Sequence, residues 1–131
     1  MRVAAITGWS GSGKTTLIVA SIARLAAQGV RVAAIKHTHH PLNDRDEGDT
    51  ARFRAAGAHP VILAGDGEAV VFARNPTRVV YNDPRDLLLH LNGAEVVLVE
   101  GFKSYNGWPR IEARESTVGD VLAILGRIPA P

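Results

Sequence analysis

A glycine-rich loop near the amino terminus constrains this chain more than any other feature. Residues 8–15 read Gly-Trp-Ser-Gly-Ser-Gly-Lys-Thr and match the pattern G-x-x-x-x-G-K-[ST]. The glycines allow the backbone to wrap so that successive N–H groups point inward at phosphate oxygens. A chance match in a chain of 131 residues is roughly one in two hundred at average residue usage. The sequence therefore predicts a P-loop that holds the phosphates of a nucleoside triphosphate.

The loop residues have expected roles in nucleotide binding. Lys14 is expected to reach the β- and γ-phosphates, and the Thr15 hydroxyl to ligate Mg²⁺. The following helix adds the positive end of its dipole, and Thr16 is spaced to lie near the α-phosphate. The predicted nucleotide-binding residues are Trp9, Ser10, Gly11, Ser12, Gly13, Lys14, Thr15 and Thr16.

The segments around the loop predict a β-α-β unit. Residues 3–6 are a short apolar run, residues 14–28 place apolar side chains at helical spacing, and residues 30–35 are a second apolar run. Gly29 follows the helix where a C-terminal cap belongs. Such a unit calls for parallel strands and a right-handed crossover. We expect one domain over residues 1–131, with a three-layer α/β P-loop fold and a mostly parallel central sheet.

Further apolar runs predict the remaining strands, at residues 61–63, 69–72, 79–81, 95–99, 111–113 and 121–125. The first two flank Gly65-Asp66-Gly67 and therefore predict an inserted β-hairpin. One helix is expected over residues 49–56, with Asp49 or Thr50 as its N-cap. Another is expected from Asp83-Pro84 to about Leu91, because proline is tolerated early in a helix.

An acidic residue follows the apolar run Val96–Val99. Glu100 stands at the carboxyl end of a predicted buried strand, where ligands bind in open α/β sheets. It is the candidate catalytic residue, because it could hold a Mg²⁺-bound water or polarise an attacking one. A solvated glutamate at a strand end is the alternative. Aspartate is commoner at this position, so a glutamate is compatible with weak or absent hydrolysis.

The segment Lys36-His37-Thr38-His39-His40 follows the second predicted strand, at the same edge of the sheet. It could form a pocket for a second anion, remain a polar surface loop, or bind a transition metal through its imidazoles. The residues alone leave these alternatives open and favour the first. The predicted anion or substrate pocket consists of Lys36, His37, His39, His40 and Lys103.

The loop before residue 50 carries several carboxylates. Most such runs are solvated or cap helices. A carboxylate from Asp44 or Asp49 could nevertheless reach Mg²⁺ through water. The predicted metal-side residues are Thr15, Asp49 and Glu100.

Composition excludes several classes of protein. The chain has no cysteine, which excludes disulfides, thiolate catalysis and cysteine-based metal sites. Its net charge is +2, and no Lys/Arg-rich block predicts nucleic-acid binding. No apolar run approaches the roughly 20 residues that cross a bilayer. We expect a cytoplasmic protein without a membrane segment.

The combined pattern resembles the molybdopterin-guanine dinucleotide biosynthesis protein B (MobB) family. The resemblance is carried, in the family's order, by residues 9–16, 36–40, 49–50 with 56–58, and 97–103. It implies a GTP-binding homodimer with Mg²⁺ that assists the guanylyltransferase joining GMP to molybdopterin, with at most slow GTP hydrolysis. It also implies contact with molybdopterin or a molybdoenzyme, an anion pocket at residues 36–40, and a Glu100 that faces Mg²⁺.

Two other functions share the first motif. A small-molecule kinase would need a lid rich in arginine, for which Arg45, Arg52 and Arg54 are candidates. A metal-delivery GTPase would use the histidine segment as its metal site. The base is also open from the residues alone, because Arg127, after the last predicted strand, cannot accept the N–H donors of guanine.

Overall fold

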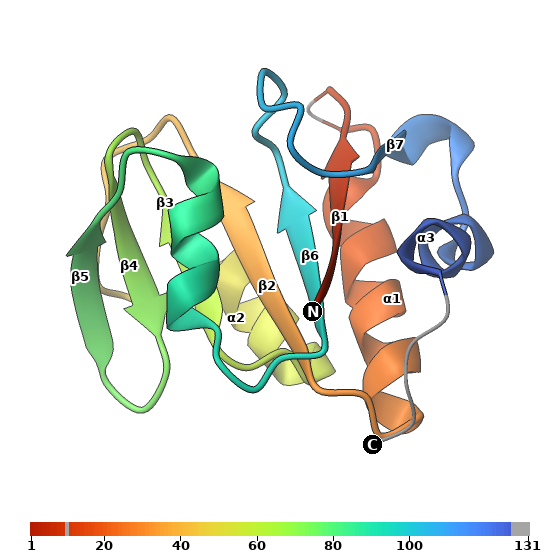
Figure 1. Cartoon of the computed structure of the whole chain (residues 1–131), viewed down its shortest axis with the longest axis horizontal. Helices are drawn as coiled ribbons and strands as arrows, with labels where there is room; N and C mark the ends of the chain where they lie inside the picture. Colours follow the sequence, from red (N-terminus) through yellow and green to blue (C-terminus); the bar gives the residue numbers. More distant parts are fainter. Residues whose placement is uncertain (10, 127–131) are drawn as a thin grey trace.

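The computed structural model describes residues 1–9 and 11–126 of the chain. The strands are β1 (Arg2–Thr7), β2 (Val32–His37), β3 (Val61–Ala64), β4 (Glu68–Phe72), β5 (Pro76–Val80), β6 (Val96–Glu100) and β7 (Arg110–Glu112). Within the described residues, these strands form one seven-stranded sheet in the order β5-β4-β3-β2-β6-β1-β7 (Figure 1). The strands β3, β2, β6, β1 and β7 pair parallel with one another in this order. The predicted mostly parallel sheet is confirmed.

Helical segments cover both faces of the sheet (Figure 1). They are α1 (Lys14–Ala27), α2 (Asp49–Ala56), α3 (Val118–Leu125) and the 3₁₀ segments η1 (Pro84–His90) and η2 (Ala113–Glu115). Helices α1, α2 and α3 share one apolar core with alternate residues of the strands, such as Ala4 and Leu98. On the opposite face, η1 packs over the other alternate residues, such as Ala5 and Val99. This is the expected three-layer α/β fold.

The predicted hairpin is confirmed and lies at one end of the sheet. β3 and β4 pair antiparallel, with Val61 opposite Phe72 and Ala64 opposite Ala69. β5 continues the meander antiparallel to β4 and begins earlier than the predicted short strand at residues 79–81. The turn between β3 and β4 follows the carboxyl end of β3. It therefore reaches the edge of the sheet at which the other parallel strands end (Figure 1).

The predicted strand at residues 121–125 is wrong, because this segment is the helix α3. Thr117 and Asp120 form a capping box: the Thr117 side chain accepts from the Asp120 N–H, and the Asp120 carboxylate accepts from the Thr117 N–H. Val121 and Leu125 are one turn apart and both buried, so a single helix face explains the run. A short apolar run does not by itself distinguish a strand from a buried helix. Arg127, considered for base recognition, lies outside the described residues.

Smaller differences concern helix type and capping. The predicted helix from Asp83 is a 3₁₀ segment with Asp83 as its N-cap. Helix α2 has the predicted extent, but Gly48 occupies its N-cap, and neither Asp49 nor Thr50 caps it. The Thr50 hydroxyl donates to the Glu47 carbonyl. The Asp49 side chain does not cap the helix and instead makes the contacts described below.

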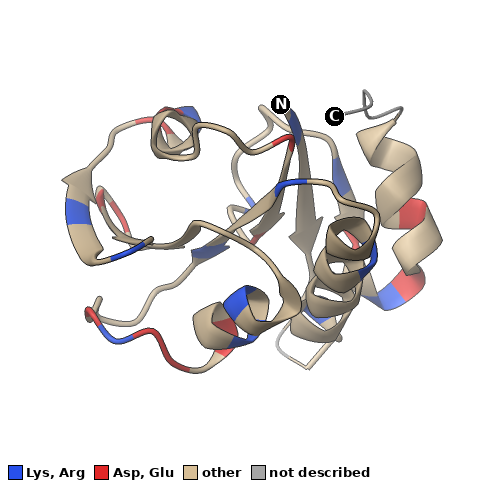
Figure 2. Cartoon of the chain, turned by 90° about the horizontal axis from the view of Figure 1, so that it is seen from below, with Lys and Arg blue, Asp and Glu red and all other residues tan. Residues whose placement is uncertain are grey.

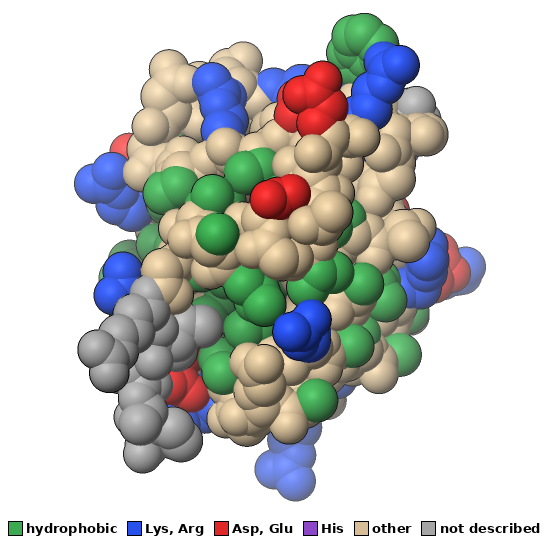
Figure 3. Space-filling model, turned by 90° about the vertical axis from the view of Figure 1, so that its right-hand side faces the viewer, with side chains coloured by type: hydrophobic (Ala, Val, Ile, Leu, Met, Phe, Trp, Pro, Cys, Tyr) green, Lys and Arg blue, Asp and Glu red, His purple; other side chains and the backbone are tan. Residues whose placement is uncertain are grey.

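Charged and apolar side chains are distributed unevenly over the surface of the protein. Charged residues of both signs follow one another along the segment that enters α2 (Figure 2). On the side of α3 and β7, apolar side chains gather between scattered charges (Figure 3). Partly buried residues of this region include Ile111, Val118, Leu122 and Ile124. No helix in the described part of the chain is long and apolar enough to span a bilayer.

We predict that Thr117→Ala lowers the free energy of unfolding by about 1 kcal/mol, because it removes the N-cap of α3. Urea unfolding should measure the change. Ser116→Ala is the matched control, since it removes a hydroxyl one residue outside the cap. Equal effects of the two substitutions would contradict the capped helix.

Candidate functional site

The glycine-rich loop connects β1 to α1 at the carboxyl edge of the parallel strands (Figure 1). Gly8 has a φ of 152°, and a Cβ atom there would lie 2.4 Å from the Ser12 Oγ. No other residue fits this turn without moving Ser12. The Lys14 ammonium donates to the Gly8 carbonyl at 2.7 Å, which closes the loop around its lysine. The loop therefore presents backbone and ammonium together, as phosphate binding requires.

A cavity of about 440 Å³ lies beside this loop. It is lined by Gly11, Gly13, Lys14, Thr15, Thr16, Lys36, Asp49 and Glu100. The structure thus brings together the three predicted metal-side residues, five of the predicted nucleotide-binding residues and one member of the predicted anion pocket. Trp9 is 71% exposed and lines a neighbouring cavity with Lys103 and Arg110. Ser10 lies outside the described residues.

Four side chains from four elements form a connected polar chain in the cavity. The Thr15 hydroxyl of α1 donates to Asp49 Oδ2 of α2 at 3.2 Å. The Lys36 ammonium of β2 donates to the same Asp49 oxygen at 2.7 Å and to Glu100 Oε1 of β6 at 3.0 Å. The ammonium therefore links two carboxylates that would otherwise repel each other.

Strand register explains why Lys36 meets Glu100. The two residues are directly paired between β2 and β6. Side chains alternate between the faces of a sheet, and the residues two positions earlier, Ala34 and Leu98, both pack in the core under α1 and α2. Lys36 and Glu100 therefore point to the face covered by α1, α2 and α3, where Thr15 and Asp49 lie.

The environment supports the charged forms of Lys36 and Asp49. Burial disfavours the Lys36 ammonium, but hydrogen bonds and charges from Asp49 and Glu100 outweigh it and raise the pKa of Lys36. Burial likewise disfavours the Asp49 carboxylate, but Lys36, the Thr15 hydroxyl and Arg52 together lower the pKa of Asp49. Both groups are charged at neutral pH.

Glu100 has free acceptor capacity inside the cavity. The residue is 5% exposed, and its Oε2 has no hydrogen-bond partner among residues 1–9 and 11–126. Buried carboxylate oxygens are normally satisfied, so such an atom marks a place for a ligand or ion. A Mg²⁺ ion prefers oxygen ligands, and Glu100, Asp49 and Thr15 supply them here. The donor set fits the predicted metal.

The predicted anion pocket is divided between the two faces of the sheet. Lys36 lines the cavity beside the glycine-rich loop, whereas His37 and His39 line a second cavity of about 610 Å³ together with Lys14 and Lys103. His40 is exposed and lies outside both cavities. The histidine segment therefore contributes to two places and does not form a single pocket.

Sequence reasoning missed the contributions of Phe102 and Asp66. The His37 ring stacks on Phe102, with ring centroids 4.1 Å apart and planes inclined by 3°. The sequence identifies Asp66 only as a turn residue, but its Oδ1 lies 3.1 Å from His37 Nε2. The signal that could have located Asp66 is its position just after a parallel strand, at the edge where the other site residues lie.

Two of the three candidate arginines for a kinase lid, Arg52 and Arg54, lie next to acidic side chains. Arg54 pairs with Asp46 at 2.7 Å, and Arg52 approaches Asp49 at 3.8 Å. Arg54 is thereby held against the segment that enters α2, whereas Arg52 lies beside Asp49, which lines the cavity at the glycine-rich loop.

Comparisons with a family model and with curated proteins point to the same family. The sequence model of the family described as molybdopterin guanine dinucleotide synthesis protein B matches residues 3–125. A molybdopterin-guanine dinucleotide biosynthesis adapter protein from Haemophilus influenzae is 41% identical over 99 residues, which cover 75% of this chain and 55% of that protein. Its counterpart from Escherichia coli is 36% identical over 107 residues, covering 76% and 58%.

The solved structures include a similar fold. The crystal structure of Bacillus subtilis MobB aligns with a TM-score of 0.55 at 25% identity, covering 95% of this chain and 74% of that one. The chain spans between 55% and 58% of the length of the two curated relatives described above.

We predict that Lys36→Met lowers the free energy of unfolding by about 3 kcal/mol at neutral pH, because it leaves the carboxylates of Asp49 and Glu100 without their shared cation. This is the low end of the range for buried pairs, since the side chains of Lys36 and Asp49 are 23% and 28% exposed. Lys103→Met, at an exposed lysine, is the matched control and should have little effect.

The difference between wild type and Lys36→Met should depend on pH. Because the pKa of Asp49 is lowered in the folded state, its contribution to folding stability is complete above the ordinary value of 3.8. That contribution is lost as pH falls through the folded-state pKa. Because the pKa of Lys36 is raised in the folded state, its contribution to folding stability is complete below the ordinary value of 10.5. That contribution is lost as pH rises through the folded-state pKa. Urea unfolding across this range should show a plateau that declines at both ends, and a constant difference would contradict the pairing.

Proposed function

The chain belongs to the molybdopterin guanine dinucleotide synthesis protein B family, and on that premise we propose that it is a GTP-binding adaptor in molybdenum-cofactor biosynthesis. The family assignment supports the pathway, and the printed names of the relatives from H. influenzae and E. coli support the adaptor role. The nucleotide part of the proposal is supported by the site itself. One observation carries it: Lys14, Thr15, Lys36, Asp49 and Glu100 converge on the cavity beside the P-loop.

Different residues of the site would bind the phosphates and the metal ion. The loop amides and Lys14 would neutralise the phosphate oxygens, aided by the amino terminus of α1. Thr15, Asp49 and Glu100 would hold Mg²⁺ directly or through water, and the ion would neutralise charge between the outer phosphates. Because Lys36 already links Asp49 and Glu100, these carboxylates are oriented toward one point before any ligand binds.

The same contacts support slow turnover. A general base needs a free carboxylate within reach of the attacking water. Glu100 Oε1 accepts a hydrogen bond from the Lys36 ammonium, the side chain is almost fully buried, and Oε2, which has no partner within the described part of the chain, is the oxygen that would hold Mg²⁺. A carboxylate held in this way is better suited to binding a metal ion than to removing a proton from water. Glu100 is thus assigned to metal positioning in an accessory protein with at most weak GTPase activity.

The proposed partners follow from the pathway. They are the guanylyltransferase that joins GMP to molybdopterin, together with molybdopterin itself or a molybdoenzyme that receives the finished cofactor. We further propose that the protein acts as a homodimer in the cytoplasm. A P-loop kinase is less favoured because the lid candidates Arg52 and Arg54 pair with acids.

Thermal unfolding with nucleotides should test the binding. GTP with Mg²⁺ at about a hundred times Kd is expected to stabilise the protein by roughly 2.7 kcal/mol, and Lys14→Ala should abolish the effect. Arg24→Ala is the control, because it removes a positive charge from the last turn of the same helix, away from the loop. Greater stabilisation by ATP than by GTP would contradict the guanine assignment.

The adaptor role should be measured separately, as the rate at which a molybdopterin guanylyltransferase forms the dinucleotide. Adding this protein with GTP is expected to raise the rate, whereas the Lys14→Ala variant should not. A rate unchanged by protein that demonstrably binds GTP would contradict the adaptor role and leave nucleotide binding intact.

A further inference from the structure

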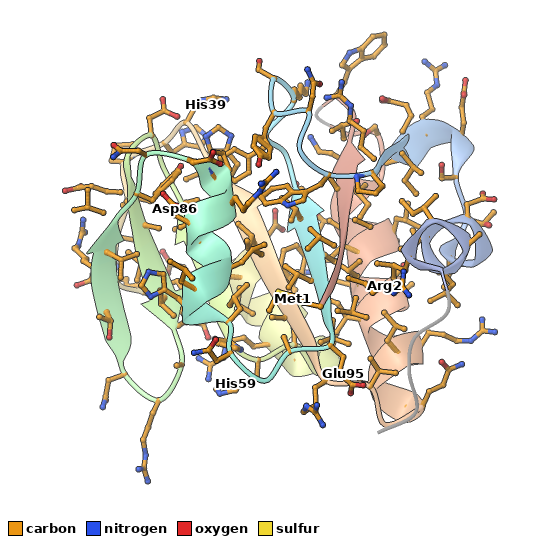
Figure 4. All side chains as sticks on the ribbon, viewed as in Figure 1. Met1, Arg2, His39, His59, Asp86 and Glu95 are labelled. Carbon is orange, nitrogen blue, oxygen red and sulfur yellow. The ribbon has the colours of Figure 1, made fainter. Side chains whose placement is uncertain are left out.

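We propose that His37, His39 and Asp66 form a binding site for a divalent transition metal ion, on the opposite face of the sheet from the P-loop cavity. His37 ends β2, His39 follows two residues later, and Asp66 lies in the turn between β3 and β4. Figure 4 shows His39 at the edge of the sheet where these segments meet. This site is independent of the nucleotide-binding proposal.

The distances between the three side chains suit a common ion. One ligand atom from each lies within 4.8 Å of the others. In a tetrahedral site with bonds of about 2.0–2.2 Å, neighbouring ligand atoms are about 3.4 Å apart. The distance of 3.1 Å between His37 Nε2 and Asp66 Oδ1 is already close to that value. His39 is exposed, so its ring can turn to complete the set without disturbing the core.

The His37 imidazole is held in place by the aromatic side chains beneath it. It stacks on Phe102, which is braced edge-on by Tyr81 and Trp108, each with ring centroids 6.3 Å away. Gly101 permits this approach, since a Cβ atom there would lie 2.9 Å from the His37 Cβ. Phe102 itself adopts a φ of 54°, which is uncommon for a bulky residue. The backbone thus accepts an unfavourable conformation that places an aromatic surface under the imidazole.

The turn that carries Asp66 is also anchored. The Gly65 N–H donates to the Glu68 carbonyl at 2.8 Å, and the Tyr81 N–H donates to the Gly67 carbonyl at 3.0 Å. The Tyr81 hydroxyl donates to the Gly65 carbonyl. Tyr81 therefore holds the turn from two sides while its ring packs against Phe102. The same residue supports both the histidine and the carboxylate.

The ligand types favour a first-row transition ion over Mg²⁺. Imidazole nitrogen suits zinc, nickel, iron and copper, whereas Mg²⁺ prefers oxygen ligands of the kind found in the P-loop cavity. Two imidazoles and one carboxylate would leave a coordination position for an external ligand. His37 and His39 line the cavity of about 610 Å³ that also contains Lys14 and Lys103, so that position would face a cationic space.

Zinc binding to the untagged full chain should test the site. Isothermal titration with Zn²⁺ is expected to give one site, and the visible spectrum of the Co²⁺-substituted protein should report nitrogen and oxygen ligands. His39→Ala and Asp66→Asn should each weaken Zn²⁺ binding by about tenfold or more. Both residues are exposed, so neither substitution should prevent folding.

His40→Ala is the matched control, since His40 is an exposed histidine next to the site but outside it. It should leave Zn²⁺ affinity unchanged. Absence of Zn²⁺ binding, or an equal loss in His40→Ala, would overturn the proposal. GTP binding with Mg²⁺, measured on the same variants, should remain at the wild-type level, which separates failure of this site from failure of the nucleotide site.

Discussion

The architecture of the phosphate cavity depends on the Lys36 ammonium between two carboxylates. Glu100 is almost fully buried at the end of a central strand, and Asp49 approaches it from α2. Two converging anions at low exposure would be unfavourable without a cation between them. Lys36 supplies that cation and joins α2 to the middle of the sheet through Asp49. The same contacts orient both carboxylates and the Thr15 hydroxyl toward the loop. The Lys36 side chain therefore contributes both to the stability of the fold and to the arrangement of the oxygen atoms in the cavity.

Strand β2 separates two chemical environments by the alternation of its side chains. Lys36 points to the face covered by α1 and α2, where oxygen ligands and the P-loop lie. His37, the next residue, points to the other face and meets Phe102 and Asp66. One strand end thus contributes to an oxygen-rich site suited to phosphate and Mg²⁺ and to an imidazole site suited to a softer ion. Lys14 lines both cavities, so the two lie next to each other at the edge of the sheet.

The segment after β6 links these environments to the aromatic core. Glu100 completes the phosphate cavity, and Gly101 allows the chain to pass close to His37. Phe102 then turns back beneath the His37 ring and contacts Tyr81, which anchors the turn between β3 and β4. Three consecutive residues therefore make three different contributions: a buried carboxylate at the cavity, a close backbone approach and support of an imidazole. Two consecutive residues with positive φ, Gly101 at 99° and Phe102 at 54°, turn the chain into these contacts.

The P-loop, the β-α-β unit, the hairpin and Glu100 at a strand end can be predicted from the amino-acid sequence alone, because each depends on local backbone requirements or on short apolar periodicity. The sequence did not determine that residues 118–125 are a helix, since the five consecutive apolar residues 121–125 satisfy either a strand or a buried helix face. Nor did it determine the pairing of Lys36 with Glu100 or of His37 with Asp66. Those contacts depend on the register between β2 and β6 and on where the turn after β3 lies. Only tertiary structure decides them, because residues distant in sequence meet according to strand order and not according to spacing along the chain.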